Sequence, residues 1–153
     1  MENSTDIREP DYSQSIARLM QTLHDGREYY RTAVDRTQDA YLGQLFQQMG
    51  RVRDAAIVRL TPFVGTDDPV ESETLVNAAG RVWTEIKAAV GQTDEVLIET
   101  MVSIEEETLE TINNVLGELT PGPQLDVVQN LQAEFSSALA DVREARDGPT
   151  TRT

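Results

Sequence analysis

The chain of 153 residues has the length of one ordinary domain, and 27 Asp and Glu against 13 Lys and Arg give it a net charge of −14. Such an acidic protein repels phosphate backbones and anionic lipid, which argues against nucleic-acid and membrane-surface roles, although the acidity is equally typical of proteins from a salty cytoplasm. The absence of cysteine excludes disulfides, thiolate metal ligands and cysteine nucleophiles. No segment approaches the roughly 20 apolar residues of a membrane span, and the N-terminus does not resemble a signal peptide, so a cytoplasmic protein is expected.

Both ends of the chain have the composition of flexible tails. Residues 1–10 are polar and end in a proline, and Gly148-Pro149 interrupts the last helical pattern. We therefore expect one domain over residues 11–147, with flexible tails at residues 1–10 and 148–153.

Apolar residues at helical spacing predict four long helices. The first covers about residues 11–38, with Asp11 as its N-cap, and the second covers residues 39–61. Almost no loop separates them, so they are expected to pack as antiparallel neighbours. The other two helices cover residues 93–119 and 123–147 and form a second hairpin around a tight proline-glycine turn.

A long connection joins the two predicted hairpins. It carries a shorter amphipathic helix over about residues 69–90, and no segment of the chain shows the alternation of a strand. Two antiparallel hairpins joined by a crossover of roughly 30 residues are typical of a ferritin-like bundle, whereas a simple up-and-down bundle has three short loops. The sequence therefore predicts an all-α, ferritin-like four-helix bundle with a short extra helix in the crossover.

Four stretches resemble, in order and spacing, a bacterial family of ferritin-like four-helix-bundle proteins of unknown function. They read DGREYYRTA, RVRDAAIVRL, GRVWTEIKAAV and IEEETLETINNVL. The resemblance runs from about Ser15 to Asp147 and implies the same ferritin-like fold. It places the characteristic residues of the family on Asp25, Gly26, Tyr30, Arg53, Trp83 and Glu105.

The chain departs from this family pattern at two places. The family usually has His-Arg before the tryptophan, where this chain has Gly80-Arg81 before Trp83. The family also tends to have a histidine in the last helix, at the position of Leu139. Both departures remove potential metal ligands.

A di-metal site of the ferritin type needs more ligands than this chain offers. Such a site takes a glutamate from each of two helices and a Glu-x-x-His pair from each of the other two. The chain has one histidine, His24, and no Glu-x-x-His pair. His24 and Glu28 are one helical turn apart, which is half a site, and they are expected on the surface; Glu105 and Glu134 are the other candidate ligands. We expect no cofactor, with iron or manganese as the alternative.

Two arginines occupy positions that face the interior of the predicted bundle. At 100° per residue, Arg27 lies on the apolar face of the first helix and Arg53 on that of the second. Glu105 lies on the apolar face of its helix, and Glu134 borders that of the last helix. Because an unpaired arginine inside a bundle would be costly, we predict a buried polar network of Arg27, Arg53, Glu105 and Glu134.

Gly26 interrupts a good helix, where it costs about 1 kcal/mol relative to alanine. It lies between Leu23 and Tyr30 at the edge of the inner face, so we expect a neighbouring backbone or a large ring to pack against it, with Trp83 as the candidate for the ring. Gly26, Tyr30 and Trp83 thus form a predicted packing motif. Tyr29 and Tyr30 are adjacent, and we expect one in the core and the other on the surface.

Residues 94–119 contain eight acids and no base. This face is either simply solvated or a docking surface for a basic protein. No nucleophile can be paired with a base, and no glycine-rich phosphate loop is present, so an enzyme is not expected. We expect a non-enzymatic structural or interaction module, with stress response as one setting, that binds a basic protein or pairs with itself. The alternative is a metal-binding, iron-handling oxidoreductase with a degenerate site.

Overall fold

The structure is a computed structural model that describes residues 12–64 and 93–151. Within these two ranges the chain forms α-helices, one 3-10 turn and no strand, which confirms the all-α prediction for this part of the protein. The elements are α2 (Ser13–Arg36), α3 (Ala40–Leu60), η1 (Thr61–Phe63), α5 (Asp94–Glu118) and α6 (Pro123–Thr151). The shorter helix predicted at 69–90, with Gly80, Arg81 and Trp83, lies outside the described residues.

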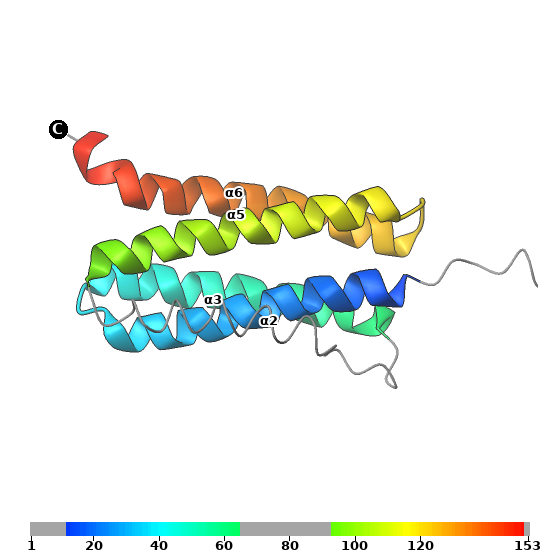
Figure 1. Ribbon diagram of the computed structural model, residues 1–153, viewed down its shortest axis with the longest axis horizontal. Helices are drawn as coiled ribbons and strands as arrows, with labels where there is room; N and C mark the ends of the chain where they lie inside the picture. Colours follow the sequence, from blue (N-terminus) through cyan, green and yellow to red (C-terminus); the bar gives the residue numbers. More distant parts are fainter. Residues whose placement is uncertain (1–11, 65–92, 152–153) are drawn as a thin grey trace, which may run out of the picture.

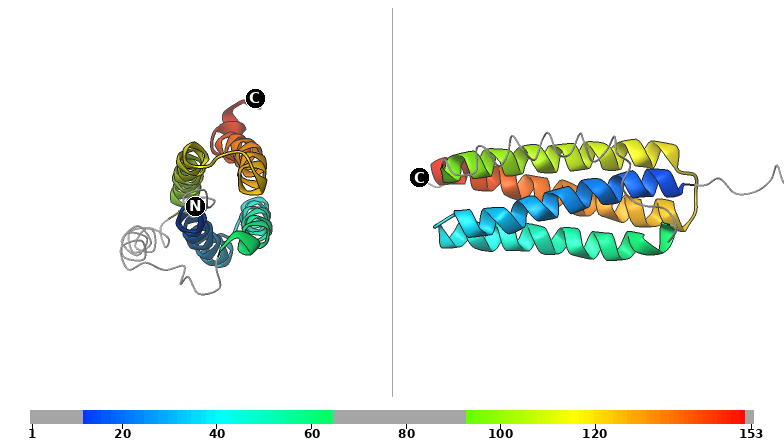
Figure 2. Two further views of the ribbon diagram at one scale, coloured as in Figure 1. Left: turned by 90° about the vertical axis from the view of Figure 1, so that its right-hand side faces the viewer. Right: turned by 60° about the horizontal axis from the view of Figure 1, so that its bottom comes forward.

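The helices form a bundle of two antiparallel hairpins (Figure 1). α2 packs along α3, α5 packs along α6, and α2 also packs against α5. Seen from its end, the bundle has the helices in the order α2, α3, α6, α5 (Figure 2). Among these neighbouring pairs, α3 and α6 make the sparsest contact. The end of α3 and the start of α5 lie at opposite ends of the bundle (Figure 1).

Two predicted helix starts are confirmed by their capping bonds. Asp39 Oδ1 accepts the backbone N–H of the third following residue at 3.1 Å, and Thr93 Oγ1 does the same at 3.2 Å. These bonds satisfy N–H groups that lack a partner within the helix. Thr37 connects the two starts, because its hydroxyl accepts from Asp39 N at 3.1 Å and donates to Asp94 Oδ1 at 2.7 Å. The turn between α2 and α3 is thereby attached to the start of α5.

The predicted start of the first helix is wrong by one residue. Tyr12 occupies the N-cap position of α2 and makes no side-chain capping bond, whereas Asp11 lies outside the described residues. The Tyr12 hydroxyl instead lies 2.7 Å from Thr120 Oγ1. A tertiary contact to the turn between α5 and α6 therefore holds this end of α2.

The predicted end of the last helix is also wrong. α6 continues through Gly148 and Pro149 to Thr151, four residues beyond the predicted end at residue 147. A proline removes one N–H donor from a helix and clashes with the preceding turn, and it can bend a helix without ending it. The cost is smallest near a helix terminus, where few hydrogen bonds remain to be lost.

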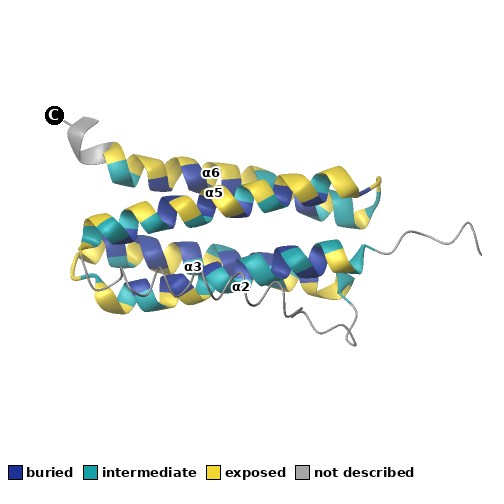
Figure 3. Cartoon of the chain, in the orientation of Figure 1, coloured by how far each residue is buried: buried dark blue, intermediate teal, exposed yellow. Residues whose placement is uncertain are grey.

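The core consists of two apolar clusters with buried polar residues between them. Buried positions recur along all four long helices (Figure 3). The cluster nearer the α2–α3 turn includes Phe46 and Met101, and the cluster nearer the α5–α6 turn includes Ile112 and Phe135. The polar residues that lie between the clusters along α3 and α5 are Arg53, Glu105 and Thr108. No helix within the described ranges carries an apolar stretch long enough to cross a membrane.

The expectation that only one of Tyr29 and Tyr30 is buried is wrong, because both side chains are 0% exposed. α2 packs against α3 on one side and α5 on the other, so its buried face is wide enough for two adjacent residues. The Tyr29 hydroxyl donates to Leu97 O at 2.9 Å, and burial raises its pKa. Tyr30 stacks on Phe46, with ring centroids 6.2 Å apart.

Candidate functional site

Arg53 and Glu105 form an ion pair at the centre of the bundle. Both side chains are 0% exposed, and Arg53 Nη2 lies 2.9 Å from Glu105 Oε2. The same nitrogen donates to Thr108 Oγ1 at 2.7 Å, and the Tyr30 hydroxyl donates to Glu105 Oε2. We call these four residues the polar layer. Thr108 in turn donates to the carbonyl one helical turn earlier, at 2.8 Å, so its side chain is held in place.

The Arg53 guanidinium contacts the other helices as well. Its Nη1 donates to the backbone carbonyls of Thr22 at 3.2 Å and Leu23 at 3.4 Å, both on α2. Its Cζ lies 5.6 Å from the ring centroids of Tyr30 and Phe135, distances at which a cation is attracted to an aromatic ring. Arg53 therefore connects α3 to α2, α5 and α6.

Gly26 is the residue that lets the guanidinium reach the backbone of α2. A Cβ at this position would lie 2.7 Å from Arg53 Nε and would overlap Cζ and Nη1 even more closely. The group that packs against Gly26 is thus Arg53, which corrects the prediction that Trp83 fills this space; Trp83 itself lies outside the described residues. A charged side chain on the neighbouring helix, rather than an aromatic ring, explains the glycine.

Electrostatics fix the protonation states of Arg53 and Tyr30. Burial alone would lower the pKa of Arg53, but the adjacent Glu105 carboxylate and Tyr30 outweigh it, and the pKa is raised. Burial, and then the negative charge of Glu105, raise the pKa of Tyr30 well above its ordinary value. Arg53 therefore stays charged and Tyr30 stays protonated, so neither can exchange a proton near neutral pH.

Two atoms of the layer have no hydrogen-bond partner among the described residues, Arg53 Nε and Glu105 Oε1. The carboxylate is thus satisfied on one oxygen only. The layer is closed to solvent, because both side chains are fully buried. Buried groups such as Arg53 and Tyr30, which keep their protons near neutral pH and do not meet solvent, have the properties of structural rather than catalytic residues.

The structure places Arg27 and Glu134 away from this pair, which corrects the predicted four-residue network. Arg27 pairs with Asp54 at 2.8 Å, and Glu134 pairs with Arg59 at 2.8 Å, both at the surface. The position of a residue around the helix axis sets the direction of its Cβ. A long side chain at the edge of the buried face can nevertheless extend to the surface and pair with an opposite charge there. Of the four predicted residues, the structure brings together Arg53 and Glu105.

Two members of the layer were absent from the predicted network, Thr108 and Tyr30. Tyr30 was expected in the core only as a packing residue. Thr108 follows Glu105 by one helical turn on an otherwise apolar face. Because buried hydroxyls are usually hydrogen-bonded, this position could have been used to predict Thr108 as a member of the buried network.

The candidate metal ligands do not assemble a site. His24 is partly buried, and burial followed by the charge of Arg27 lowers its pKa. Glu28 accepts from Arg31 at 3.1 Å and lies 3.9 Å from Arg27, so cations of the protein already surround it. Across residues 12–64 and 93–151, no group of three or more His, Asp or Glu side chains is arranged to hold a metal ion.

The acidic surface of α5 is partly neutralised by arginines of α2 and α6. The pairs are Glu106 with Arg143 at 2.8 Å, Glu118 with Arg18 at 3.0 Å, and Glu99 with Arg146 at 3.9 Å. Exposed pairs of this kind contribute about 0–1 kcal/mol each. The expected docking face on this helix is therefore already occupied in part by the bundle's own cations.

A comparison with protein families identifies the family of this chain. A family profile with the description "Domain of unknown function (DUF2383)" matches residues 11–118. The match contains α2, α3 and α5, and with them the whole polar layer, whereas α6 lies beyond it. No curated protein and no solved structure matches the chain. Because the profile covers more than half of the chain, the protein belongs to the DUF2383 family, whose domain has no assigned function.

Proposed function

We propose that the protein is a non-enzymatic interaction module that acts through its surface, while the interior of the bundle serves stability. The observation that carries this proposal is the Arg53–Glu105 ion pair, fully buried at the centre of the bundle. In a helical bundle, the centre is where a cofactor or metal would be held by inward-facing side chains. Here an internal cation occupies that position.

We further propose that the bundle has ferritin-like connectivity and works in the cytoplasm of a bacterium. The connectivity is supported by the two tight hairpins and by the placement of the end of α3 and the start of α5 at opposite ends of the bundle (Figure 1). An up-and-down bundle would have those two ends side by side.

The chemistry of the donor set does not fit a ferritin-type iron or manganese centre. Such a centre needs four carboxylates and two histidines from the four helices. The polar layer supplies one carboxylate, Glu105, which Arg53 already neutralises at 2.9 Å. A metal ion at this position would meet the positive guanidinium within the same layer.

Adding metal ions tests directly whether the bundle has a metal site. We expect the melting temperature of the natural protein to stay the same when Fe²⁺ or Mn²⁺ is added without oxygen. A metal present at 100 times its Kd would stabilise the protein by about 2.7 kcal/mol and raise the melting temperature by several degrees. A rise of that size, lost when Glu105 is replaced by glutamine, would favour the metal-binding alternative.

The interaction role is tested by photo-crosslinking in the cells that produce the protein. A benzoylphenylalanine is placed at one exposed position on each helix, Arg31, Tyr41, Glu107 or Asp126. A module that works through its surface is expected to give a covalent adduct with another protein from at least one of these positions. Four folded variants that yield no adduct would contradict the proposal.

A further inference from the structure

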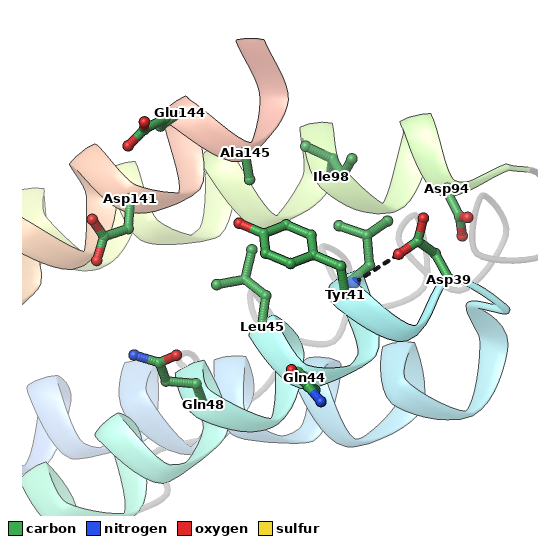
Figure 4. Close-up of a pocket in the computed structure, with 11 residues that line it drawn as sticks. Asp39, Tyr41, Gln44, Leu45, Gln48, Asp94, Ile98, Asp141, Glu144 and Ala145 are labelled. Atoms are coloured by element: carbon green, nitrogen blue, oxygen red, sulfur yellow. Dashed lines mark hydrogen bonds between the residues drawn. The ribbon is translucent and has the colours of Figure 1, made fainter. Parts of the chain in front are cut away.

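The sparse contact between α3 and α6 leaves an open groove along one side of the bundle. Its larger hollow has a volume of about 710 Å³ and is lined by residues of α3, α5 and α6 (Figure 4). A second hollow of about 490 Å³ continues along α3 and α6 and shares Gln48 and Asp141 with the first. We call the two together the α3–α6 groove.

Part of the wall of the groove is apolar, and an aromatic ring lies beside this part. Leu42, Leu45 and Ile98 line the larger hollow, and Met49 and Val52 line the smaller one. Tyr41 lies in the gap between α3 and the other two helices, although 60% of its surface is exposed (Figure 4). Exposed aromatic residues beside an apolar hollow are typical of the centres of protein interfaces.

The outer edge of the groove is negatively charged. Asp39, Asp94, Asp141 and Glu144 line the larger hollow, and no Lys or Arg among the described residues lines either hollow. Asp39 and Asp94 are engaged in the capping and turn bonds already described. Asp141 and Glu144 form no ion pair within the described part of the chain, and Figure 4 shows their carboxylates on the α6 side of the groove.

These features select a positively charged, amphipathic occupant. The groove follows α3 from Asp39 to Val52, about 20 Å at ~1.5 Å per residue, which is enough for three to four helical turns. An apolar floor receives the apolar face of a helix, and acids along the edge attract Lys and Arg on its flanks. A second copy of this chain is a poor occupant, because each copy carries a net charge of −14.

We propose that the α3–α6 groove binds an amphipathic helix rich in Lys and Arg on a partner protein. This inference rests on the proposed interaction role and specifies the surface that performs it. Tyr41 and the apolar floor supply affinity, while Asp141 and Glu144 attract the partner and set its charge preference.

The test uses a synthetic amphipathic helix of about 18 leucines and lysines, about 27 Å long, with a fluorescent label. Its binding to the full chain is followed by fluorescence anisotropy. A peptide with glutamate in place of every lysine is expected not to bind. Binding of the lysine peptide is expected to weaken with added salt, because the charged edge is exposed to solvent.

Matched variants decide whether the groove is the binding surface. Tyr41→Ala is expected to raise the Kd for the lysine peptide about tenfold, as for an aromatic interface residue, whereas Val58→Ala, 70% exposed on the same helix outside the groove, leaves it unchanged. The double variant Asp141→Asn/Glu144→Gln is expected to bind the lysine peptide more weakly, and its binding is expected to depend less on salt. The control Glu107→Gln/Glu110→Gln removes the same charge from α5 at exposed positions that do not line the groove.

If the groove variants and the control variants changed the Kd for the lysine peptide equally, the proposed binding site would be wrong, since attraction by net charge alone would then explain binding. A dimer in sedimentation equilibrium that Tyr41→Ala dissociates and Val58→Ala does not would overturn it in favour of a second copy. Failure of the groove is distinguishable from failure of the interaction role. Crosslinks from Arg31, Glu107 or Asp126 but not from Tyr41 would reject the groove alone, while the absence of any crosslink rejects the role itself.

Discussion

Replacement of Glu105 by alanine is expected to lower the free energy of unfolding by about 3–5 kcal/mol, the usual cost of removing one partner of a buried ion pair. Arg53 would keep its charge, because a guanidinium stays protonated in proteins, and it would then have no carboxylate at the centre of the bundle. Tyr30 would lose the acceptor of its hydroxyl as well. Denaturation with urea and linear extrapolation measures the change, and the result should be the same with and without added iron or manganese.

Two controls separate the ion pair from other effects of the substitution. Glu134→Ala removes a carboxylate whose pair with Arg59 is partly exposed, and it is expected to cost about 1 kcal/mol or less. Arg53→Met with Glu105→Leu removes both charges together, and replacing a buried pair by apolar residues is often neutral or stabilising. A loss of stability in the double variant as large as in Glu105→Ala would show that packing, not charge, explains the single substitution.

The parts of the fold that depend on local chemistry could be predicted from the sequence. The sequence predicts helices that start at Asp39 and near Thr93, directly before apolar helical patterns, and both residues make N-capping bonds there. The inward direction of Arg53 and Glu105 follows from their spacing on apolar faces, because the helical period fixes where each Cβ points. Both side chains are fully buried in the structure.

The parts that depend on distances between helices could not be predicted. Arg27 and Arg53 both lie on apolar faces in the sequence, but Arg27 reaches Asp54 at the surface, and only the position of the neighbouring helix decides this. The group beside Gly26 was misassigned for the same reason, since a glycine in a helix shows that something packs closely without showing what does. The α3–α6 groove has no sequence signal, because it results from the looser packing of two helices.

Burying the polar layer costs free energy, but the layer also fixes how the helices are aligned. An apolar core allows neighbouring helices to slide past one another by a turn, whereas Arg53 has bonding partners on α2 and α5 at one register only. Buried polar residues fix register in some helical assemblies at a cost in stability. The layer therefore has a structural role that requires neither a ligand nor a titrating group.

Gly26→Ala tests the close approach between α2 and the Arg53 guanidinium, and it is expected to destabilise the protein by about 1–3 kcal/mol through overpacking. Helix propensity alone predicts the opposite, a gain of about 1 kcal/mol. The added Cβ would overlap the guanidinium, which cannot move aside without losing Glu105, Thr108 and the carbonyls of α2. The sign of the change in unfolding free energy, measured by urea denaturation, therefore distinguishes the two effects.

Gly117→Ala is the matched control, because Gly117 is an exposed helical glycine with no atom within 4 Å of an added Cβ. Only the helix propensity of the residue changes at this position, so the substitution is expected to raise the free energy of unfolding by up to about 1 kcal/mol. Combining Gly26→Ala with Arg53→Met and Glu105→Leu should restore part of the loss, since a flexible, uncharged methionine can move away from the new Cβ. If Gly26→Ala stabilised the protein as Gly117→Ala is expected to, the guanidinium would not need the space beside α2, and the glycine would have another cause.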